Sequence, residues 1–364
     1  MKITHYYPYL LLHESGPGNA ILGWCRALAR LGVETNVVVD ERAVHISPPK
    51  DIECIRLKHV GRRRLRAPVR MPPLGSDEPL LVTHGGWALA NVVAGRLARR
   101  QRVPYAVMPH GVYHPRVLQR GALLKRAWFS ALERPYLEAA AAIHVFFPAE
   151  IEHLVALGVR SPVVVAPNGI TPPEGVLWDG GSGGYLLWLG RYDPVNKGLD
   201  MLLHGLRLLP ETDRPRLRLH GRDWHGGRLV VERLVRELDL EDSVTVGDPV
   251  YGEAKWRLMA QAIGFVYPSR WDASPVAVAE AESIGTPTLV ADYPMGRFLS
   301  SRGGALLIDL TPSGVKAGIA WLGSAEAGEC GSRGREIARR ELSWDRMASS
   351  WLEQMRSLLA HQGT

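Results

Sequence analysis

The sequence predicts an α/β protein of two domains, each a parallel sheet with helices wound on both of its faces. The chain has 364 residues, about two to three times the usual ~150 residues of a domain. Short runs of β-branched residues alternate with helical patterns along the whole chain, which is typical of parallel sheets covered by helices. A Pro-rich and then Gly-rich stretch interrupts this alternation near the middle, and it separates two similar sets of elements.

The strands of the first set are predicted from apolar, β-branched runs of four or five residues. They are Thr35–Val39, Leu80–Thr83, Tyr105–Met108, Ala142–Phe146 and Val163–Ala166. The second set contains five runs of the same kind. They are Tyr185–Leu189, Arg216–His220, Ser243–Val246, Gly264–Tyr267 and Thr288–Ala291.

The domain boundary is predicted at residues 170–184, where prolines are followed by five glycines in a stretch typical of a linker. This places the first domain at 1–169 and the second at 185–342; one large domain with a long loop is the alternative. Two doubly wound domains facing each other across a cleft would point the carboxyl ends of both sheets into it. Residues 343–364 predict an amphipathic helix with Ser343 as its N-cap, able to pack back on the first domain.

Composition excludes several classes of protein. With 46% hydrophobic and 22% charged residues, the chain is neither disordered nor a coiled coil. Three distant cysteines are too few for a disulfide framework or a tetrahedral zinc site. No apolar run approaches the ~18 residues of a membrane-spanning helix, and the N-terminus lacks a signal-peptide pattern, so we expect a cytoplasmic protein.

The net charge of +7 is unevenly distributed. Residues 1–170 contain 22 Lys and Arg against 12 Asp and Glu, whereas the rest of the chain is slightly acidic. The excess is densest in Arg56–Arg70 and Arg96–Arg102. A basic face of this kind suits an anionic or membrane-associated acceptor, or a peripheral place at the inner membrane face; a solvated surface is the plain alternative. No nucleic-acid-binding motif is present, so nucleic acid is not an expected partner.

Three loops contain the residue types that bind anionic ligands. The first is Gly16-Pro17-Gly18, a glycine turn that opens a helix and would offer backbone N–H groups to a phosphate or carboxylate. The second follows a predicted strand and contains Arg191 and Lys197, two cations suited to a diphosphate and to the charge that builds on a leaving group. Both loops also occur as plain connections in other proteins.

The third loop, Ser269–Val276, again follows a predicted strand. Ser274 is expected to cap a helix that has Pro275 at its first position, so that the helix amides point at a bound diphosphate. Asp272 lies before the cap and Glu280 lies eight positions later, inside the helix. Glu280 suits ribose hydroxyls, and Asp272 reaches farther out, toward the hydroxyls of a sugar.

The Arg191/Lys197 loop and the Asp272/Glu280 pair resemble the paired motifs of glycosyltransferase family 4, which are retaining nucleotide-sugar transferases of the GT-B fold, built of two Rossmann-like domains. The same order of motifs continues through the chain. It includes Gly16–Gly18, Pro109-His110-Gly111-Val112, Pro167-Asn168-Gly169-Ile170 and Gly285-Thr286-Pro287. The resemblance covers nearly the whole length of the sequence.

The resemblance implies a role for each matching residue. Glu280 would hold the ribose, and Arg191 and Lys197 the diphosphate, while backbone near Gly16 and Gly18 would approach phosphate or acceptor. His110 would position the donor sugar near its anomeric carbon. The remaining donor-binding positions are Val250, Ser274, Pro275 and Val276, with the base recognised by backbone of residues 246–250. Asp272 stands where the family usually has Glu followed by Gly, and this departure shortens the side chain expected to contact the sugar.

The resemblance therefore implies a transferase that moves a sugar from a UDP-sugar, or a GDP-sugar, to a hydroxyl in glycan, glycolipid or secondary-metabolite biosynthesis. It implies no cofactor and no metal, because the nucleotide sugar is a substrate and the leaving phosphate takes the proton of the acceptor. Two alternatives are a nucleotide-sugar epimerase, which would release no nucleotide, and a non-catalytic nucleotide-sugar binder, which Asp272 in place of Glu favours. A phosphorylase would need a cofactor-binding lysine motif, and the sequence lacks it.

Overall fold

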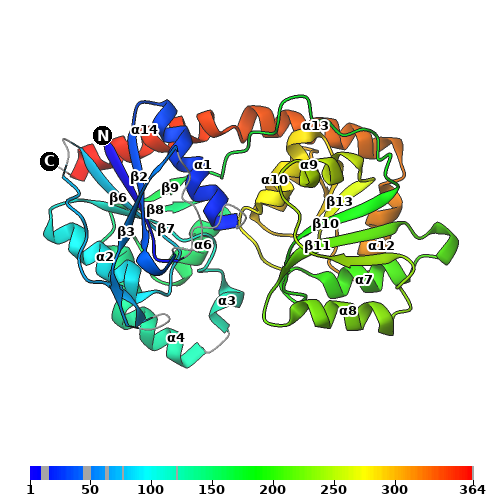
Figure 1. Ribbon diagram of the computed structural model, residues 1–364, viewed down its shortest axis with the longest axis horizontal. Coiled ribbons are helices and arrows are strands. Elements are labelled where there is room, and N and C mark those ends of the chain that lie inside the picture. Colours follow the sequence, from blue (N-terminus) through cyan, green and yellow to red (C-terminus); the bar gives the residue numbers. More distant parts are fainter. Residues whose placement is uncertain (10–15, 44–50, 62–64, 76–77, 120–121, 363–364) are drawn as a thin grey trace. The chain divides into compact units, whose positions relative to one another are not determined.

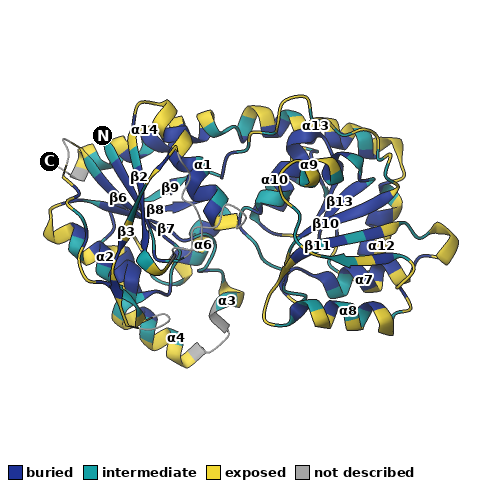
Figure 2. Cartoon of the chain, viewed as in Figure 1, coloured by how far each residue is buried: buried dark blue, intermediate teal, exposed yellow. Residues whose placement is uncertain are grey.

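The computed structural model describes residues 1–9, 16–43, 51–61, 65–75, 78–119 and 122–362 (Figure 1). The chain forms two compact units. Unit 1 comprises Met1–Gly169 together with Trp344–Thr364, and unit 2 comprises Ile170–Ser343. Each unit has its own sheet, and Figure 2 shows the strands of both sheets as mostly buried.

Unit 1 is built on a seven-stranded sheet of order β3-β2-β1-β6-β7-β8-β9, in which all neighbouring strands are parallel. Its strands are β1 (Lys2–Tyr7), β2 (Glu34–Asp40), β3 (Glu53–Leu57), β6 (Pro79–His84), β7 (Tyr105–Met108), β8 (Ala142–Val145) and β9 (Val163–Val165), with a separate antiparallel pair β4 (His59–Val60) and β5 (Ala67–Pro68). Its helices are α1 (Gly16–Arg30), η1 (Glu41–Ala43), α2 (Leu89–Arg100), α3 (Pro115–Gln119), α4 (Ala122–Trp128), η3 (Phe129–Glu133), α5 (Arg134–Glu138), α6 (Ala149–Ala156) and α14 (Trp344–Gln362).

Unit 2 is built on a six-stranded parallel sheet of order β12-β11-β10-β13-β14-β15. Its strands are β10 (Tyr185–Tyr192), β11 (Arg216–Asp223), β12 (Val244–Gly247), β13 (Gly264–Tyr267), β14 (Thr288–Val290) and β15 (Leu306–Leu307). Its helices are α7 (Leu199–Arg207), η4 (Glu211–Asp213), α8 (Gly227–Glu237), α9 (Gly252–Gln261), α10 (Val276–Ile284), α11 (Pro294–Ser300), α12 (Pro312–Trp321) and α13 (Ala325–Glu341).

The prediction of two doubly wound parallel sheets is confirmed. All ten predicted strands are present, although β10 and β11 each extend three residues past the predicted end. The sequence analysis missed β1, β3 and β15 of the two parallel sheets and the short antiparallel pair of β4 and β5. The central strand β1 contains Thr4 and His5, which are 3% and 1% exposed, and buried polar residues do not form the apolar run by which a strand is recognised.

Both sheets contain a point at which the strand order reverses. In unit 1 it lies between β1 and β6, and in unit 2 between β10 and β13. At such a point the loops leaving the two strands diverge to opposite faces of the sheet, and ligands of open α/β sheets bind beside the carboxyl ends of these strands. The functional residues predicted from the sequence are therefore expected at these two sheet edges.

The stretch expected as a linker, 170–184, belongs to unit 2. The amide N–H groups of Trp178, Asp179 and Gly183 donate to the carbonyls of Ile284, Ala260 and Gln261, so this stretch is tied to the unit by backbone hydrogen bonds.

The last helix belongs to unit 1. α14 begins at Trp344, directly after Ser343, and packs against α1 and β9. The Trp24 ring of α1 contacts the rings of both Trp344 and Trp351 in edge-on or tilted geometry, with centroids 5.5 and 5.9 Å apart. Burial of these large rings is expected to contribute most of the attachment of α14.

Candidate donor site

The carboxyl ends of β10 and β13 bring the predicted Lys197 and Asp272 into direct contact. The Lys197 Nζ atom lies 2.5 Å from Asp272 Oδ2, and Lys197 is only 8% exposed. Tyr267, the last residue of β13, completes the cluster: its hydroxyl accepts from Lys197 Nζ at 2.7 Å and donates to Asp272 Oδ2 at 3.0 Å. The second carboxylate oxygen of Asp272 accepts from the amide of Ala273.

The backbone beside Lys197 is held in place by the next residue. Gly198 has φ of +65° and lies so close to β13 that a Cβ atom would stand 1.9 Å from the Pro268 carbonyl oxygen. Only glycine fits a position that combines a left-handed φ with such a close approach. Lys197 is thereby placed at the switch point of the sheet before any ligand is bound.

The charges in this cluster are set by one another. Burial acts to raise the pKa of Asp272, but the ammonium of Lys197 and the hydrogen bonds from Lys197 and Tyr267 outweigh it and hold that pKa below its usual range. Burial, followed by the Asp272 carboxylate, raises the pKa of Tyr267 well above its usual value, so its hydroxyl stays protonated. The cluster is therefore a buried ion pair with a neutral phenol.

Arg191 lies at the same edge, near the end of β10, and its guanidinium carbon lies 4.5 Å from the ring centroid of Trp224. Trp224 directly follows β11 and is 43% exposed, which is unusual for so large an apolar ring. The positive charge of Arg191 contributes to the lowered pKa of Asp272, so the two cations and the carboxylate share one electrostatic environment.

The helix after Asp272 begins one residue later than predicted. α10 starts at Val276, and the N-cap is Pro275, not Ser274. Pro275 keeps an extended ψ of 116° while its carbonyl accepts from the amides of Val278 and Ala279. Because the proline side chain has no acceptor, no side-chain cap occupies the first amides of the helix. These N–H groups and the positive end of the helix dipole suit a phosphate.

Glu280 lies inside α10, and its carboxylate is paired with a lysine that the sequence analysis did not single out. The Lys255 Nζ atom of α9 is 2.5 Å from Glu280 Oε1. Burial raises the pKa of Glu280, and the Lys255 ammonium opposes that rise. Glu280 is 7% exposed, so Lys255 orients a carboxylate with little freedom to move.

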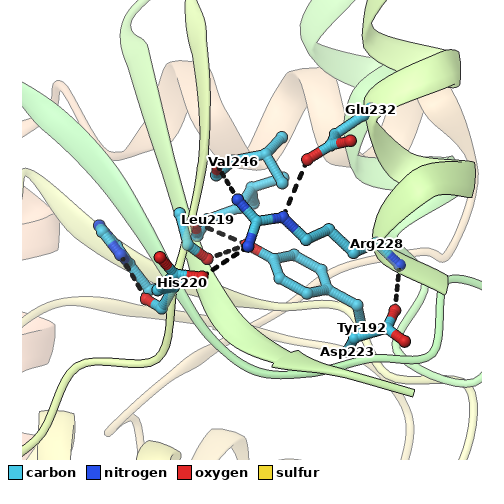
Figure 3. Close-up of polar contacts among 9 residues, drawn as sticks. Tyr192, Leu219, His220, Asp223, Arg228, Glu232 and Val246 are labelled. Carbon is cyan, nitrogen blue, oxygen red and sulfur yellow. Dashed lines mark hydrogen bonds and ion pairs between the residues drawn. The ribbon is translucent and has the colours of Figure 1, made fainter. Parts of the chain in front are cut away.

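The loop after β12, predicted to contact the base through its backbone, is fixed by the network in Figure 3. The Tyr192 hydroxyl donates to the carbonyls of Leu219 and Gly247 at 2.9 and 2.8 Å. Arg228 of α8 binds the Asp248 carboxylate at 2.6 Å and the Val246 carbonyl at 3.3 Å. Together these bonds fix the start of the loop that continues to Val250.

The other predicted residues, His110, Gly16 and Gly18, lie in unit 1. His110 follows β7 and has a φ of +56°, a conformation that non-glycine residues adopt rarely and mostly where the surrounding structure imposes it. Burial, together with the smaller effect of the neighbouring His144, lowers the pKa of His110 to about 3, so the imidazole is neutral at pH 7. Gly16 and Gly18 lie in the first turn of α1, where Gly18 is buried; residues 10–15 of that loop are outside the described residues.

Several residues at these sites could not be found from the sequence pattern. Lys255, Tyr267 and Trp224 belong to segments far from their partners in sequence, so no short motif connects them. Tyr267 was predicted only as the end of a strand. In unit 1, His5 contacts His84, and His84 contacts His110. Only the occurrence of a histidine in an apolar strand could have indicated His5.

Two doubly wound units, with a cation cluster and an uncapped helix at the switch point of the second, define the GT-B class of nucleotide-sugar transferases. Comparison with protein families agrees. Residues 15–169 match the family described as "Glycosyl transferase 4-like domain", and residues 181–309 match "Glycosyl transferases group 1". The chain belongs to these family 4, group 1 glycosyltransferases, and it transfers a sugar from a nucleotide-sugar donor.

Solved structures share the whole fold at low sequence identity. Sucrose-phosphate synthase from Thermosynechococcus elongatus is 19% identical, with a TM-score of 0.79 and 99% of each chain covered. HepE from Anabaena, solved with UDP and glucose, is 15% identical, with a TM-score of 0.74 over 98% of this chain and all of that one. WaaG, a glycosyltransferase of lipopolysaccharide biosynthesis, is 14% identical, with a TM-score of 0.69 over 96% and 98%. No curated protein matches the sequence.

Within the described ranges, no group of three or more His, Cys, Asp or Glu side chains is arranged to hold a metal ion. The same part of the chain contains no helix that is both long and apolar enough to span a bilayer.

Proposed function

We propose that the chain is a retaining, metal-independent glycosyltransferase whose donor is a UDP-sugar, with a GDP-sugar as the second choice. The observation that carries this proposal is the cluster of Arg191, Lys197 and Asp272 beside the uncapped start of α10. Two fixed cations and free helix amides neutralise a diphosphate without a divalent metal. Glu280, oriented by Lys255, accepts hydrogen bonds from the ribose hydroxyls.

In the proposed reaction, the bond between the anomeric carbon and the diphosphate oxygen breaks. A new bond forms from the acceptor oxygen to the same face of that carbon. Because the new bond forms on the face that the leaving group occupied, the configuration is retained. The proton of the acceptor hydroxyl passes to the leaving phosphate oxygen, so no carboxylate base is needed. Arg191 and Lys197 stabilise the charge that develops on the leaving diphosphate, which lowers the barrier. His110 positions the donor sugar.

UDP is favoured over GDP because HepE, which shares the fold, was solved with UDP and with UDP-glucose. The direct test is calorimetric titration of the full chain with UDP, GDP and ADP, first without metal and then with magnesium. We expect UDP to bind most tightly and magnesium to leave its Kd unchanged. No binding of any nucleoside diphosphate would contradict the proposal. If the chain binds UDP but releases no UDP from any UDP-sugar tested, the alternative of a non-catalytic nucleotide-sugar binder is favoured.

The acceptor is proposed to be anionic or at a membrane surface, at the inner face of the cytoplasmic membrane. This rests on the basic excess of residues 1–170 and on the C-terminal end of α2, where Arg96, Arg99, Arg100 and the following Arg102 are all exposed. Arg66, by contrast, pairs with the buried Asp40 at 2.8 Å and so serves unit 1 itself. Arg62, Arg63 and Arg64 lie outside the described residues.

Neutralising these arginines tests the proposal. Replacing Arg96, Arg99 and Arg100 with glutamine should weaken association with vesicles containing anionic lipid several-fold, as should the same change at Arg62–Arg64. Replacement of Arg339, an exposed arginine of unit 2, is the control. If vesicle binding stayed the same in both triple variants, the arginines would have no role in membrane or acceptor binding, and the proposal would be wrong.

A further inference from the structure

Three histidines form a hydrogen-bonded chain at the switch point of unit 1. His5 Nδ1 lies 2.9 Å from His84 Nε2, and His84 Nδ1 lies 3.0 Å from His110 Nε2. Their rings are stacked, with centroids 5.2 and 5.3 Å apart. His5 lies in β1, His84 is the last residue of β6, and His110 is the second residue after β7. These three strands are neighbours in the sheet. His5 and His84 are buried, whereas His110 is half-buried.

All three rings are neutral at pH 7. Burial and, to a smaller extent, His144 lower the pKa of His5 and of His110 to about 3. Burial also lowers the pKa of His84 well below its ordinary value, and the neighbouring histidines add to this effect. A neutral imidazole has one N–H and one lone pair, and each contact in the chain needs one of each. The protons therefore have only two consistent arrangements.

The inner end of the chain distinguishes the two arrangements. His5 Nε2 is buried and has no hydrogen-bond partner within the described structure. If every ring carries its proton on Nε2, His5 is left with a buried N–H that has no acceptor. If every ring carries its proton on Nδ1, His5 is left with only an unused lone pair. Unpaired buried N–H groups are rarer in proteins than unpaired acceptors, so the second arrangement is favoured.

His144 is the other titratable group beside the chain, and it does not change this result. Its Nε2 atom lies 2.6 Å from the Ala166 carbonyl oxygen, which only accepts hydrogen bonds, so Nε2 must carry the proton. His144 Nδ1 is therefore a lone pair. Neither this atom nor His5 Nε2 has a hydrogen-bond partner in the part of the chain that the structure describes, so His144 does not terminate the chain.

We propose that His5 and His84 are positioning residues that fix His110 as its Nδ1–H tautomer, so that His110 presents a hydrogen-bond donor on its unpaired side. In this tautomer the Nε2 lone pair of His110 accepts from His84, and Nδ1, which has no partner in the described structure, is free to donate. Its role in the reaction rests on the proposed function: an N–H at this atom binds an oxygen of the donor sugar and takes no proton from the acceptor.

The first test needs no substrate. Full-length protein with 15N-labelled histidine is studied at pH 7 by long-range 1H–15N spectroscopy, which separates a protonated ring nitrogen from a bare one. Signals are assigned with His5→Asn, His84→Asn and His110→Asn. We expect His110, His84 and His5 all to carry the proton on Nδ1. A proton on Nε2 of His110, or a charged ring there, would overturn the proposal even if the enzyme is fully active.

The second test compares two substitutions at His84. Asparagine places its amide N–H near the position of Nδ1–H and keeps a donor to His110, whereas phenylalanine keeps the ring shape without a donor. We expect His84→Phe to lower kcat for UDP release from UDP-glucose about tenfold with the Kd for UDP unchanged, and His84→Asn to retain kcat within about threefold. Equal losses in both variants, at equal thermal stability, would show a merely structural role.

The two tests separate failure of this inference from failure of the proposed function. If the wild-type chain binds no UDP and releases none from UDP-glucose, the proposed function fails for that donor. The 15N spectra of the wild-type protein still decide the proton arrangement of His110. Conversely, normal turnover with the reversed arrangement leaves the proposed function intact and contradicts only the role of His5 and His84.

Discussion

At the scale of single residues, the proposed donor site contains two pairs of opposite charge, Lys197 with Asp272 in loops after strands and Lys255 with Glu280 between helices α9 and α10. Glu280 is the residue whose role is easiest to separate from the others. Its carboxylate is proposed to bind ribose, while Arg191 and Lys197 are proposed to bind the diphosphate. A ligand that contains only one of these groups therefore distinguishes the two assignments.

Glu280→Gln should lower the affinity for UDP about tenfold, because a charged acceptor contributes roughly 1.5–3 kcal/mol to a hydrogen bond and a neutral amide less. Its affinity for pyrophosphate, which lacks a ribose, should not change. Both are measured by calorimetry. The matched control is Glu253→Gln in α9, whose side chain is exposed and pairs with Arg257. If the variant lost affinity for UDP and for pyrophosphate equally, Glu280 would maintain the structure of the site and would not bind the ribose.

Which site residues could be predicted follows from the range of their interactions. Arg191, Lys197 and Asp272 each follow a strand that the sequence predicts, and a strand followed by a loop with charged residues is visible in a short window of sequence. In the structure, Arg191 lies within the end of β10. Lys255 and Trp224 act through Glu280 and Arg191, and each pair is joined only by the fold. The start of α10 was misplaced by one residue because Ser-Pro is a common helix start, while here Pro275 itself remains extended.

At the scale of elements, α14 is fixed to unit 1 by a close fit around one tryptophan. A Cβ atom on Gly23 would stand 2.1 Å from the Trp344 ring, and one on Gly169 would stand 2.5 Å from the backbone and ring of the same residue. The indole lies against two glycines, and neither position has room for a methyl group. The predicted amphipathic pattern of residues 343–364 contains no sign of this requirement.

Gly169→Ala should therefore lower the free energy of unfolding of unit 1 by about 1–3 kcal/mol, the usual cost of forcing one methyl group into a packed site. Denaturant unfolding followed by tryptophan fluorescence and circular dichroism measures it. Gly75→Ala, where a Cβ atom would have no neighbour within 4 Å, is the control. If both variants were equally stable, α14 would not be tightly packed at Trp344.

At the scale of the whole molecule, burial shifts the pKa values of histidines in unit 1 and of glutamic acids in unit 2. In unit 1, burial lowers the pKa values of His5, His84, His110 and His144. Unit 2 buries Glu280 and Glu282, whose pKa values burial raises. A histidine with a lowered folded pKa takes up its proton only on unfolding, whereas a glutamic acid with a raised folded pKa loses its proton only on unfolding.

The two units should therefore respond to acid in opposite directions. Between pH 6.5 and about 4, each buried histidine removes stability from unit 1, at most about 1.4 kcal/mol per pH unit for each group. As the pH falls toward 4.5, unit 2 gains stability from its two glutamic acids, and Asp272, whose pKa is lowered, has an effect only below about 3.8.

Hydrogen exchange followed by mass spectrometry at pH 7, 6 and 5, corrected for the pH dependence of intrinsic exchange rates, measures the change in stability of each unit. Peptides from β1, β6 and β7 should lose protection as the pH falls, while peptides from β10 and β13 should keep it. Glu282→Gln, which removes one of the titrating groups, should flatten the response of unit 2. Loss of protection in unit 2 before unit 1 would contradict the prediction.

The chain passes from unit 1 to unit 2 after Gly169 and returns after Ser343, and the Ile170 amide donates to the Leu342 carbonyl where the two passages meet. Unit 2 is thus continuous in sequence and unit 1 is not. During synthesis on the ribosome, residues 1–169 emerge first but lack α14, while residues 170–343 emerge as a complete folding unit. The segment synthesised last, α14, therefore completes the unit whose synthesis began first. A nascent chain arrested before Trp344 leaves the face of α1 that includes Gly23 and Trp24 uncovered.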